Sequence, residues 1–142
     1  MSKTNVQPYL FYGGRCEEAL EFYKAALGAE VGMVMRFDQS PEAPPPGMLA
    51  SGFEKKVMHS EFKVGEMTLM ASDGCSPEDG GFNGFRLALV VSTEAEADKA
   101  FNGLANGGKV DMPLAKTFWS PRYGMVTDKF GLGWMVMVPA PR

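Results

Sequence analysis

The two halves of this chain repeat one order of sequence signals, and this repeat restricts the fold more than any other feature. Residues 10–31 read as an apolar strand, a polar start, an amphipathic helix, a glycine and a second strand. Residues 88–110 read in the same order, and Gly28 precedes Gly107 by 79 residues. Self-similarity of this kind indicates two copies of one structural module.

A second match has a different offset. Gly65 and Gly131, which are 66 residues apart, each precede a strand rich in methionine. The two offsets differ by 13 residues, which is close to the length of a proline-rich stretch found only in the first half, residues 38–52. Proline cannot donate hydrogen bonds within a sheet, so we expect an exposed loop there. A solvated connector is the commoner role for such a loop, and a lid over an active site is the alternative.

Each half predicts one helix and four strands. Apolar residues recur at helical spacing over residues 16–27, and Gly28 is positioned to end this helix. Thr93 begins a second helix with a capping box, in which the Glu96 side chain reaches back to the cap amide. The resulting order, strand–helix–strand–strand–strand, predicts an α+β fold made of two tandem βαβββ modules.

These modules are expected to share one domain. We place the first module at residues 4–73, a Gly- and Pro-containing linker at residues 74–83 and the second module at residues 84–139. A four-stranded sheet with a single helix leaves one face uncovered, and that face must pack against its copy or another chain. The uncovered face is also where a ligand could bind.

Composition excludes several classes of protein. Hydrophobic residues make up 45% of the 142 residues, which provides a core and excludes disorder. The net charge is −3 and no basic stripe is present, so we expect no nucleic-acid binding. No apolar run approaches the roughly 20 residues of a membrane span, and the N-terminal residues 1–4 lack the apolar stretch of a signal peptide, so we expect neither feature. Two cysteines without a CxxC motif suggest reduced thiols and a cytoplasmic protein.

Methionine is frequent, with 11 in the chain. Several alternate with other residues in strand-like runs: Met33 and Met35, Met67 and Met70, Met135 and Met137. Methionine side chains adapt to irregular gaps, so they suit either a tolerant core or a plastic ligand cavity, and the core is the commoner case.

Further stretches narrow the pattern to a family: residues 9–14, 19–23, 27–30, 57–62, 69–73, 119–124 and 127–134. In order and spacing they resemble the PhnB-like branch of the vicinal oxygen chelate superfamily, which includes glyoxalase I, extradiol dioxygenases, and bleomycin- and fosfomycin-resistance proteins. The resemblance covers nearly the whole chain and implies the curved mixed sheets of that superfamily. The branch often carries the label 3-demethylubiquinone methyltransferase, but no Gly-rich loop is placed to hold a methyl-donor nucleotide.

The resemblance also implies where a metal would bind. Metal-dependent relatives take one His or Glu from the first and last strand of each module. These positions fall near Pro8, Leu69, Arg86 and Met135, or at Tyr9, Met70 or Phe85 if the register shifts. None of these residues offers the imidazole or carboxylate that such an ion prefers. We therefore expect no metal and no other cofactor.

Five residues are candidate ligand contacts: Tyr9, Arg86, Trp119, Arg122 and Trp134. Arg86 could replace the cation and hold an anionic group, or equally could pair with an acid as a structural residue. The three aromatic residues could wall a planar ligand, although such residues more often lie in a core or interface. Arg122 could contact an anion at a pocket mouth, although a surface role is more common.

His59 is the single histidine of the chain, so a His–His metal pair is impossible. Glu61 shares its strand face, and a His–carboxylate pair can act as a general base or as half of a metal site. An ordinary solvated strand edge that includes Lys63 is the favoured alternative. We therefore keep His59 and Glu61 as candidate catalytic residues only.

Two classes of function follow. The first is a metal-independent, homodimeric protein that binds or sequesters a small molecule. The second is a vicinal oxygen chelate-type enzyme, such as a lyase, isomerase or dioxygenase-like protein, acting on a small oxygenated substrate. That enzyme would need His59 and Glu61 to face the cavity. A scaffold subunit without a ligand is a third, weaker possibility.

Overall fold

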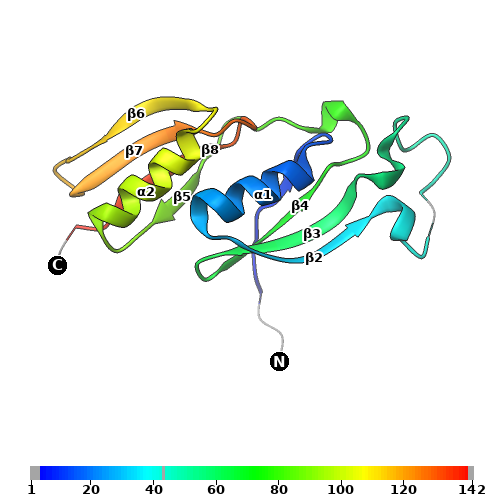
Figure 1. Ribbon diagram of the computed structural model, residues 1–142, viewed down its shortest axis with the longest axis horizontal. Helices are drawn as coiled ribbons and strands as arrows, with labels where there is room; N and C mark the ends of the chain where they lie inside the picture. The colour runs from blue at the N-terminus through cyan, green and yellow to red at the C-terminus, as the bar shows by residue number, and fades with distance from the viewer. Residues whose placement is uncertain (1–3, 43, 141–142) are drawn as a thin grey trace. The chain divides into compact units, whose positions relative to one another are not determined.

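Two four-stranded sheets form the framework of the computed structural model, which describes residues 4–42 and 44–140 (Figure 1). The first half contains β1 (Tyr9–Phe11), α1 (Cys16–Leu27), β2 (Glu30–Arg36), β3 (Val57–Val64) and β4 (Met67–Ser72). The second half contains β5 (Leu87–Val90), α2 (Glu94–Ala105), β6 (Lys109–Ala115), β7 (Arg122–Thr127) and β8 (Gly133–Val138).

The two sheets have the same topology. Their strand orders are β1-β4-β3-β2 and β5-β8-β7-β6. In each sheet the first strand pairs with the last in parallel, and the other pairs are antiparallel. This repetition confirms the predicted α+β fold of two βαβββ modules.

The chain divides into two compact units. The first unit ends at Gly81 and the second begins at Phe82. The last residues of α1, Ala25–Leu27, group with the second unit. We call them unit 1 and unit 2. Within the described part of the chain, neither helix is long and apolar enough to cross a membrane.

The apolar stripe of α1 packs on one face of the first sheet. Its buried members are Cys16, Ala19, Leu20 and Tyr23, and the Tyr23 ring stacks on Phe62 of β3 at a centroid distance of 5.7 Å. Gly28 adopts a φ of 67° and ends the helix, which confirms the prediction for this residue. Burial raises the pKa of the Cys16 thiol to about 12, so this cysteine is an inert core residue.

The second helix follows the predicted pattern with one difference at its start. Its buried residues are Ala97, Ala100, Phe101 and Leu104. The Thr93 hydroxyl oxygen accepts a hydrogen bond from the Glu96 backbone N–H at 3.1 Å. The Glu96 carboxylate, however, accepts from the Thr93 hydroxyl at 3.1 Å rather than from the cap amide. Half of the predicted capping box is therefore replaced by a bond between the two side chains.

The proline-rich stretch is an exposed loop, as predicted. Between the short 3-10 helices η1 (Phe37–Gln39) and η2 (Phe53–Lys55), the described residues contain no strand. Ala43 lies outside the described residues. The backbone N–H of Ala50 donates to the Cys75 carbonyl oxygen at 2.8 Å, which ties the end of the loop to unit 1.

A buried carboxylate joins three segments of unit 1. Asp73, directly after β4, is 1% exposed. Its Oδ1 accepts from the backbone N–H groups of Gly14 and Cys16 at 2.8 and 2.7 Å, and its Oδ2 accepts from that of Val57 at 2.9 Å. Asp73 therefore fixes the start of α1 and of β3 to the end of β4.

In unit 2 the buried aspartate Asp128 has a more local role. Its Oδ1 accepts from the backbone N–H groups of Phe130 and Leu132 at 2.9 and 3.1 Å. Its Oδ2 accepts from the Trp134 indole N–H at 2.9 Å. The aspartate before the last strand therefore caps the backbone of its turn.

Replacing Asp73 with Ala should lower the free energy of unfolding by about 3 kcal/mol or more, because three buried N–H groups lose their acceptor. Urea denaturation followed by circular dichroism measures this difference. The matched control is Asp38→Ala at the exposed 3-10 helix η1, which should change stability by no more than about 0.5 kcal/mol. Equal denaturation midpoints for the two variants would contradict this role of Asp73.

Candidate functional site

The face of the first sheet that α1 does not cover carries the candidate catalytic pair, His59 and Glu61, together with Tyr9. We call it the open face. Its members alternate along the strands with buried residues that point toward α1. They are Tyr9 and Phe11 on β1, Glu30, Met33 and Met35 on β2, His59, Glu61 and Lys63 on β3, and Thr68 and Met70 on β4.

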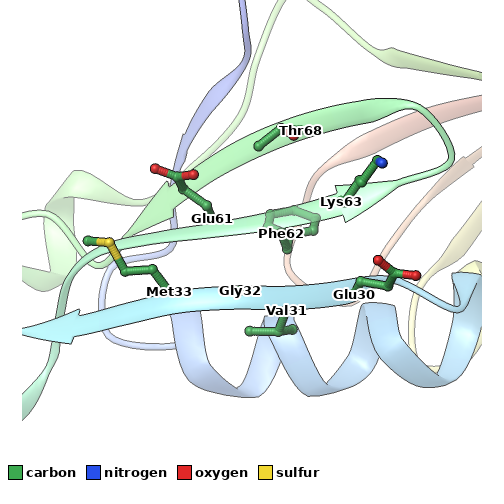
Figure 2. A pocket seen from close by; sticks show the side chains of 8 residues that line it. All are labelled: Glu30, Val31, Gly32, Met33, Glu61, Phe62, Lys63 and Thr68. Atoms are coloured by element: carbon green, nitrogen blue, oxygen red, sulfur yellow. The ribbon is translucent and has the colours of Figure 1, made fainter.

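Strand register brings residues of the open face into rows. Met70 pairs with Tyr9 on one side and with Glu61 on the other, so these three lie in one row across the sheet. In the neighbouring row Lys63 lies between Thr68 and Glu30 (Figure 2). Directly opposed side chains in a sheet are close enough to interact. The register therefore concentrates polar groups on the middle of this face.

Tyr9, His59 and Glu61 form a continuous hydrogen-bonded chain. The Tyr9 hydroxyl lies 2.8 Å from His59 Nδ1, and His59 Nε2 lies 3.3 Å from a Glu61 carboxylate oxygen. The Tyr9 ring stacks on Phe11 at a centroid distance of 5.0 Å. Tyr9 is 39% exposed, and the side chains of His59 and Glu61 are 23% and 46% exposed. The chain is therefore held in place yet open to solutes.

The direction of these hydrogen bonds follows from the chemistry of the three groups. Burial raises the pKa of the Tyr9 hydroxyl, so the group stays protonated at neutral pH and is the donor to Nδ1. A neutral imidazole that accepts at Nδ1 carries its proton on Nε2. The Nε2–H group then donates to the Glu61 carboxylate. Such an arrangement orients the ring.

A hollow of about 270 Å³ lies beside Glu61, the last residue of this hydrogen-bonded series (Figure 2). It lies where the ladder between β2 and β3 is interrupted, between Val31 and Val34. Figure 2 shows Glu61 and Lys63 pointing away from α1 and Val31 pointing toward it. The lining residues are Glu30, Val31, Gly32, Met33, Glu61, Phe62, Lys63 and Thr68. Glu61 belongs to both features, so the hollow and the hydrogen-bonded chain form one site.

A second hollow, of about 550 Å³, lies in unit 2 and is lined in part by Arg86, Thr127 and Met135. The Arg86 guanidinium forms an ion pair with Asp111 at 3.0 Å and also contacts the Val126 and Trp134 carbonyl oxygens at 3.3 and 3.4 Å. Of the two roles considered for Arg86, this geometry favours the structural one.

The Asp111 carboxylate is held from two sides. The Thr127 hydroxyl donates to it at 2.5 Å, and the Arg86 guanidinium donates to the same oxygen at 3.0 Å. The hydrogen bond from Thr127, followed by that from Arg86, lowers the pKa of Asp111. The Arg86–Asp111 pair is therefore charged across the neutral range.

The remaining predicted contact residues, Trp134, Arg122 and Trp119, belong to unit 2. Trp134 is 2% exposed and its indole N–H is bonded to Asp128, which places it in the core. Arg122 forms ion pairs with Asp98 at 3.1 Å and Glu94 at 3.8 Å, both on α2. Trp119 is 43% exposed and its ring lies edge-on to Tyr123 at 5.3 Å. These contacts all lie within unit 2.

The predicted metal positions can be compared with the register. Leu69 is 4% exposed and faces α1. In unit 1 the predicted metal positions that lie on the open face are therefore Tyr9 and Met70, which the sequence analysis gave for a shifted register. Their side chains do not offer the nitrogen or carboxylate ligands that a divalent ion of this fold requires. Within the described residues, no three His, Cys, Asp or Glu side chains are grouped to hold a metal ion. These positions do not fit a resident metal.

Two features of the fold were not visible in the sequence analysis. The Tyr9–His59 hydrogen bond spans β4, and no local pattern indicates that β4 lies between β1 and β3. The sequence pattern includes Asp73 only within a stretch that resembles the family. Its side chain accepts hydrogen bonds from the backbone N–H groups of Gly14 and Cys16 at the start of α1. The Gly13-Gly14 turn before the helix is a signal that could have suggested a buried acceptor.

Comparison with known proteins places these observations in a family context. The sequence model of a family described as 3-demethylubiquinone-9 3-methyltransferase matches residues 4–137. The Escherichia coli K12 protein YjdN is 31% identical over 140 residues, which cover 94% of each chain. The crystal structure of PA1353 from Pseudomonas aeruginosa is 39% identical, with a TM-score of 0.83 over 96% of this chain and 98% of that one.

More distant structures show the fold. A PhnB protein from Bacillus cereus is 26% identical, with a TM-score of 0.78 over 95% of this chain and 99% of that one. A glyoxylase/bleomycin resistance protein/dioxygenase domain from Frankia and the fosfomycin resistance protein FosX from Listeria monocytogenes have TM-scores of 0.68 and 0.64. Their identities are 10% and 12%, so these two similarities concern the fold alone.

The Arg86–Asp111 pair predicts a pH-dependent stability. Because the pKa of Asp111 is lowered in the folded protein, the stabilisation is present above the carboxyl's unfolded pKa and lost as pH falls through the folded pKa. Asp111→Asn should therefore cost up to about 1 kcal/mol at neutral pH and less in acid. Urea denaturation over a pH series measures this, with Asp38→Asn as the exposed control. A cost that stays constant or grows in acid would contradict the assignment.

Proposed function

The chain belongs to the 3-demethylubiquinone-9 3-methyltransferase family, the PhnB- and YjdN-like group with the vicinal oxygen chelate fold, and on that premise we propose that it binds a small organic molecule without a metal ion. The ligand site is the open face of unit 1. One observation carries this proposal: Glu61 both lines the hollow and belongs to the hydrogen-bonded series Tyr9–His59–Glu61.

Methyl transfer is not proposed, because the residues do not fit a methyl-donor nucleotide. The start of a helix after a first strand is where such a ligand would find free backbone N–H groups. Here Asp73 accepts from the N–H groups of Gly14 and Cys16. A side-chain atom on Gly13 would lie 2.6 Å from the Pro77 carbonyl oxygen, which shows how tightly the turn is packed.

The chemistry of the open face indicates the kind of ligand. Met33, Met35 and Met70 provide adaptable apolar contacts, while Glu61 and Lys63 provide charges of opposite sign. The hollow of about 270 Å³ is near the lower end of the roughly 300–1,000 Å³ found for ligand pockets. This combination favours a small ligand with an apolar body and a polar or charged group.

The resemblance to the superfamily also predicts a homodimer, and the cysteine usage predicts a cytoplasmic location; both belong to this proposal. Sedimentation velocity on the full chain tests the association state. A mass equal to one chain across the micromolar range would contradict the dimer.

A thermal-shift screen over small aromatic and anionic compounds tests the ligand site. A ligand at about 100 times its Kd should raise Tm by roughly 5 °C or more, because it binds only the folded protein. The shift should persist in excess EDTA, since no metal takes part. Met70→Glu should weaken binding by about tenfold or more, because it places a carboxylate that repels anionic ligands at the centre of the open face.

The matched control is Met48→Glu in the exposed proline-rich loop, which should bind as the unaltered chain does. A shift that disappears in EDTA and returns with zinc or manganese would contradict the metal-independent site. The absence of saturable stabilisation by any compound would contradict the binding function itself.

A further inference from the structure

The Tyr9–His59–Glu61 chain has the geometry of a proton path. Each of its two links joins a hydrogen-bond donor to an acceptor, at 2.8 Å from Tyr9 to His59 and at 3.3 Å from His59 to Glu61. The Tyr9 hydroxyl is the end that a ligand can reach, because Tyr9 is 39% exposed and ends the chain on the open face. Glu61 is the carboxylate end, and it contacts the imidazole at Nε2.

The surroundings of the imidazole are consistent with this path. Met35 pairs with His59 from β2, and Met70 of β4 lies in the row of Tyr9 and Glu61. The other titratable or charged groups that the strands place on this face are Glu30, Glu61, Lys63 and Tyr9. Among the described acids, Glu61 is the one that contacts the ring.

We propose that the hydrogen-bonded residues Tyr9, His59 and Glu61 form a proton-accepting site. This site binds small molecules that carry an acidic aromatic hydroxyl group and holds them in the ionised form. The inference rests on the ligand site proposed above and names the class of ligand. A phenol is suited to this face because the stacked rings of Tyr9 and Phe11 offer an aromatic surface beside the accepting oxygen.

The proposed step is a coupled transfer of two protons. The ligand O–H bond breaks and its proton passes to the Tyr9 hydroxyl oxygen, while the Tyr9 proton passes to His59 Nδ1. The products are the bound phenolate, neutral Tyr9 and an imidazolium that donates to Glu61. Charge balances, since one anion and one cation form, and no oxidant or reductant is needed. Burial raises the pKa of Tyr9, which disfavours a free tyrosinate and couples the two transfers.

The tautomer of His59 gives a first test that needs no ligand. Because the chain has a single histidine, ¹⁵N-imidazole NMR of the tag-free full-length protein reports on this ring alone. At alkaline pH, where the ring is neutral, Nδ1 should show the shift of an unprotonated nitrogen and Nε2 that of a protonated one. Glu61→Gln and Tyr9→Phe should each weaken this preference. A ring protonated on Nδ1 in the unaltered protein would overturn the proposal.

Ligand ionisation is tested with 4-nitrophenol, whose phenolate absorbs visible light. At a pH where the free probe is mostly protonated, binding to the unaltered chain should raise the phenolate fraction at least about threefold, which requires less than 1 kcal/mol. Tyr9→Phe should bind the probe mainly as the neutral phenol, because the accepting oxygen is missing. Tyr12→Phe, at the buried Tyr12–Tyr23 pair, is the matched control and should behave as the unaltered chain.

A second probe separates the possible outcomes. 4-Nitroanisole has the same ring without the acidic proton and should bind about tenfold or more weakly, because it cannot form the charged pair. Binding of 4-nitrophenol only as the neutral phenol, equal phenolate in Tyr9→Phe, or no binding of this probe would each overturn the inference. The ligand site proposed above would survive those results if another compound of the thermal-shift screen binds there.

Discussion

A four-stranded sheet with one helix buries side chains on only one face, and the site of this protein depends on that asymmetry. In unit 1 the apolar side chains of α1 pack on Phe62 and its neighbours, while Asp73 fixes the start of the helix to the sheet. The covered face therefore supplies stability. The open face is free to hold groups such as His59 and Glu61, which would be costly to bury.

The two units use the same topology for different chemistry. In unit 1 the open face presents a hydrogen-bonded chain that ends at an exposed tyrosine hydroxyl. In unit 2 the polar set is an ion pair between Arg86 and Asp111, closed by Thr127 and backbone carbonyl groups. The first arrangement leaves the Tyr9 hydroxyl oxygen able to accept a hydrogen bond from a ligand. In the second, the charged groups Arg86 and Asp111 bind each other. Duplication of the module therefore preserved the strand order and not the polar residues.

Much of this fold was predictable because its signals are local. The helical stripe of α1, the glycine at position 28 and the buried stripe of α2 are set by spacing along the chain. Strand register is not local: β1 pairs with β4 across about 60 residues, from Tyr9 to Met70. Hence sequence reasoning placed a ligand position near Leu69, which faces the helix. It recognised the His59–Glu61 pair, which lies on one strand, and missed the bond to Tyr9.

The central claim is that ligands bind the open face of unit 1, and methyl NMR of methionine-labelled protein tests it most directly. Met33, Met35 and Met70 lie on that face, and Met125, Met135 and Met137 lie in unit 2. Titration with a ligand that stabilises the protein should shift the first set of methyl signals and leave the second set unchanged. Shifts confined to the methionines of unit 2 would contradict the account.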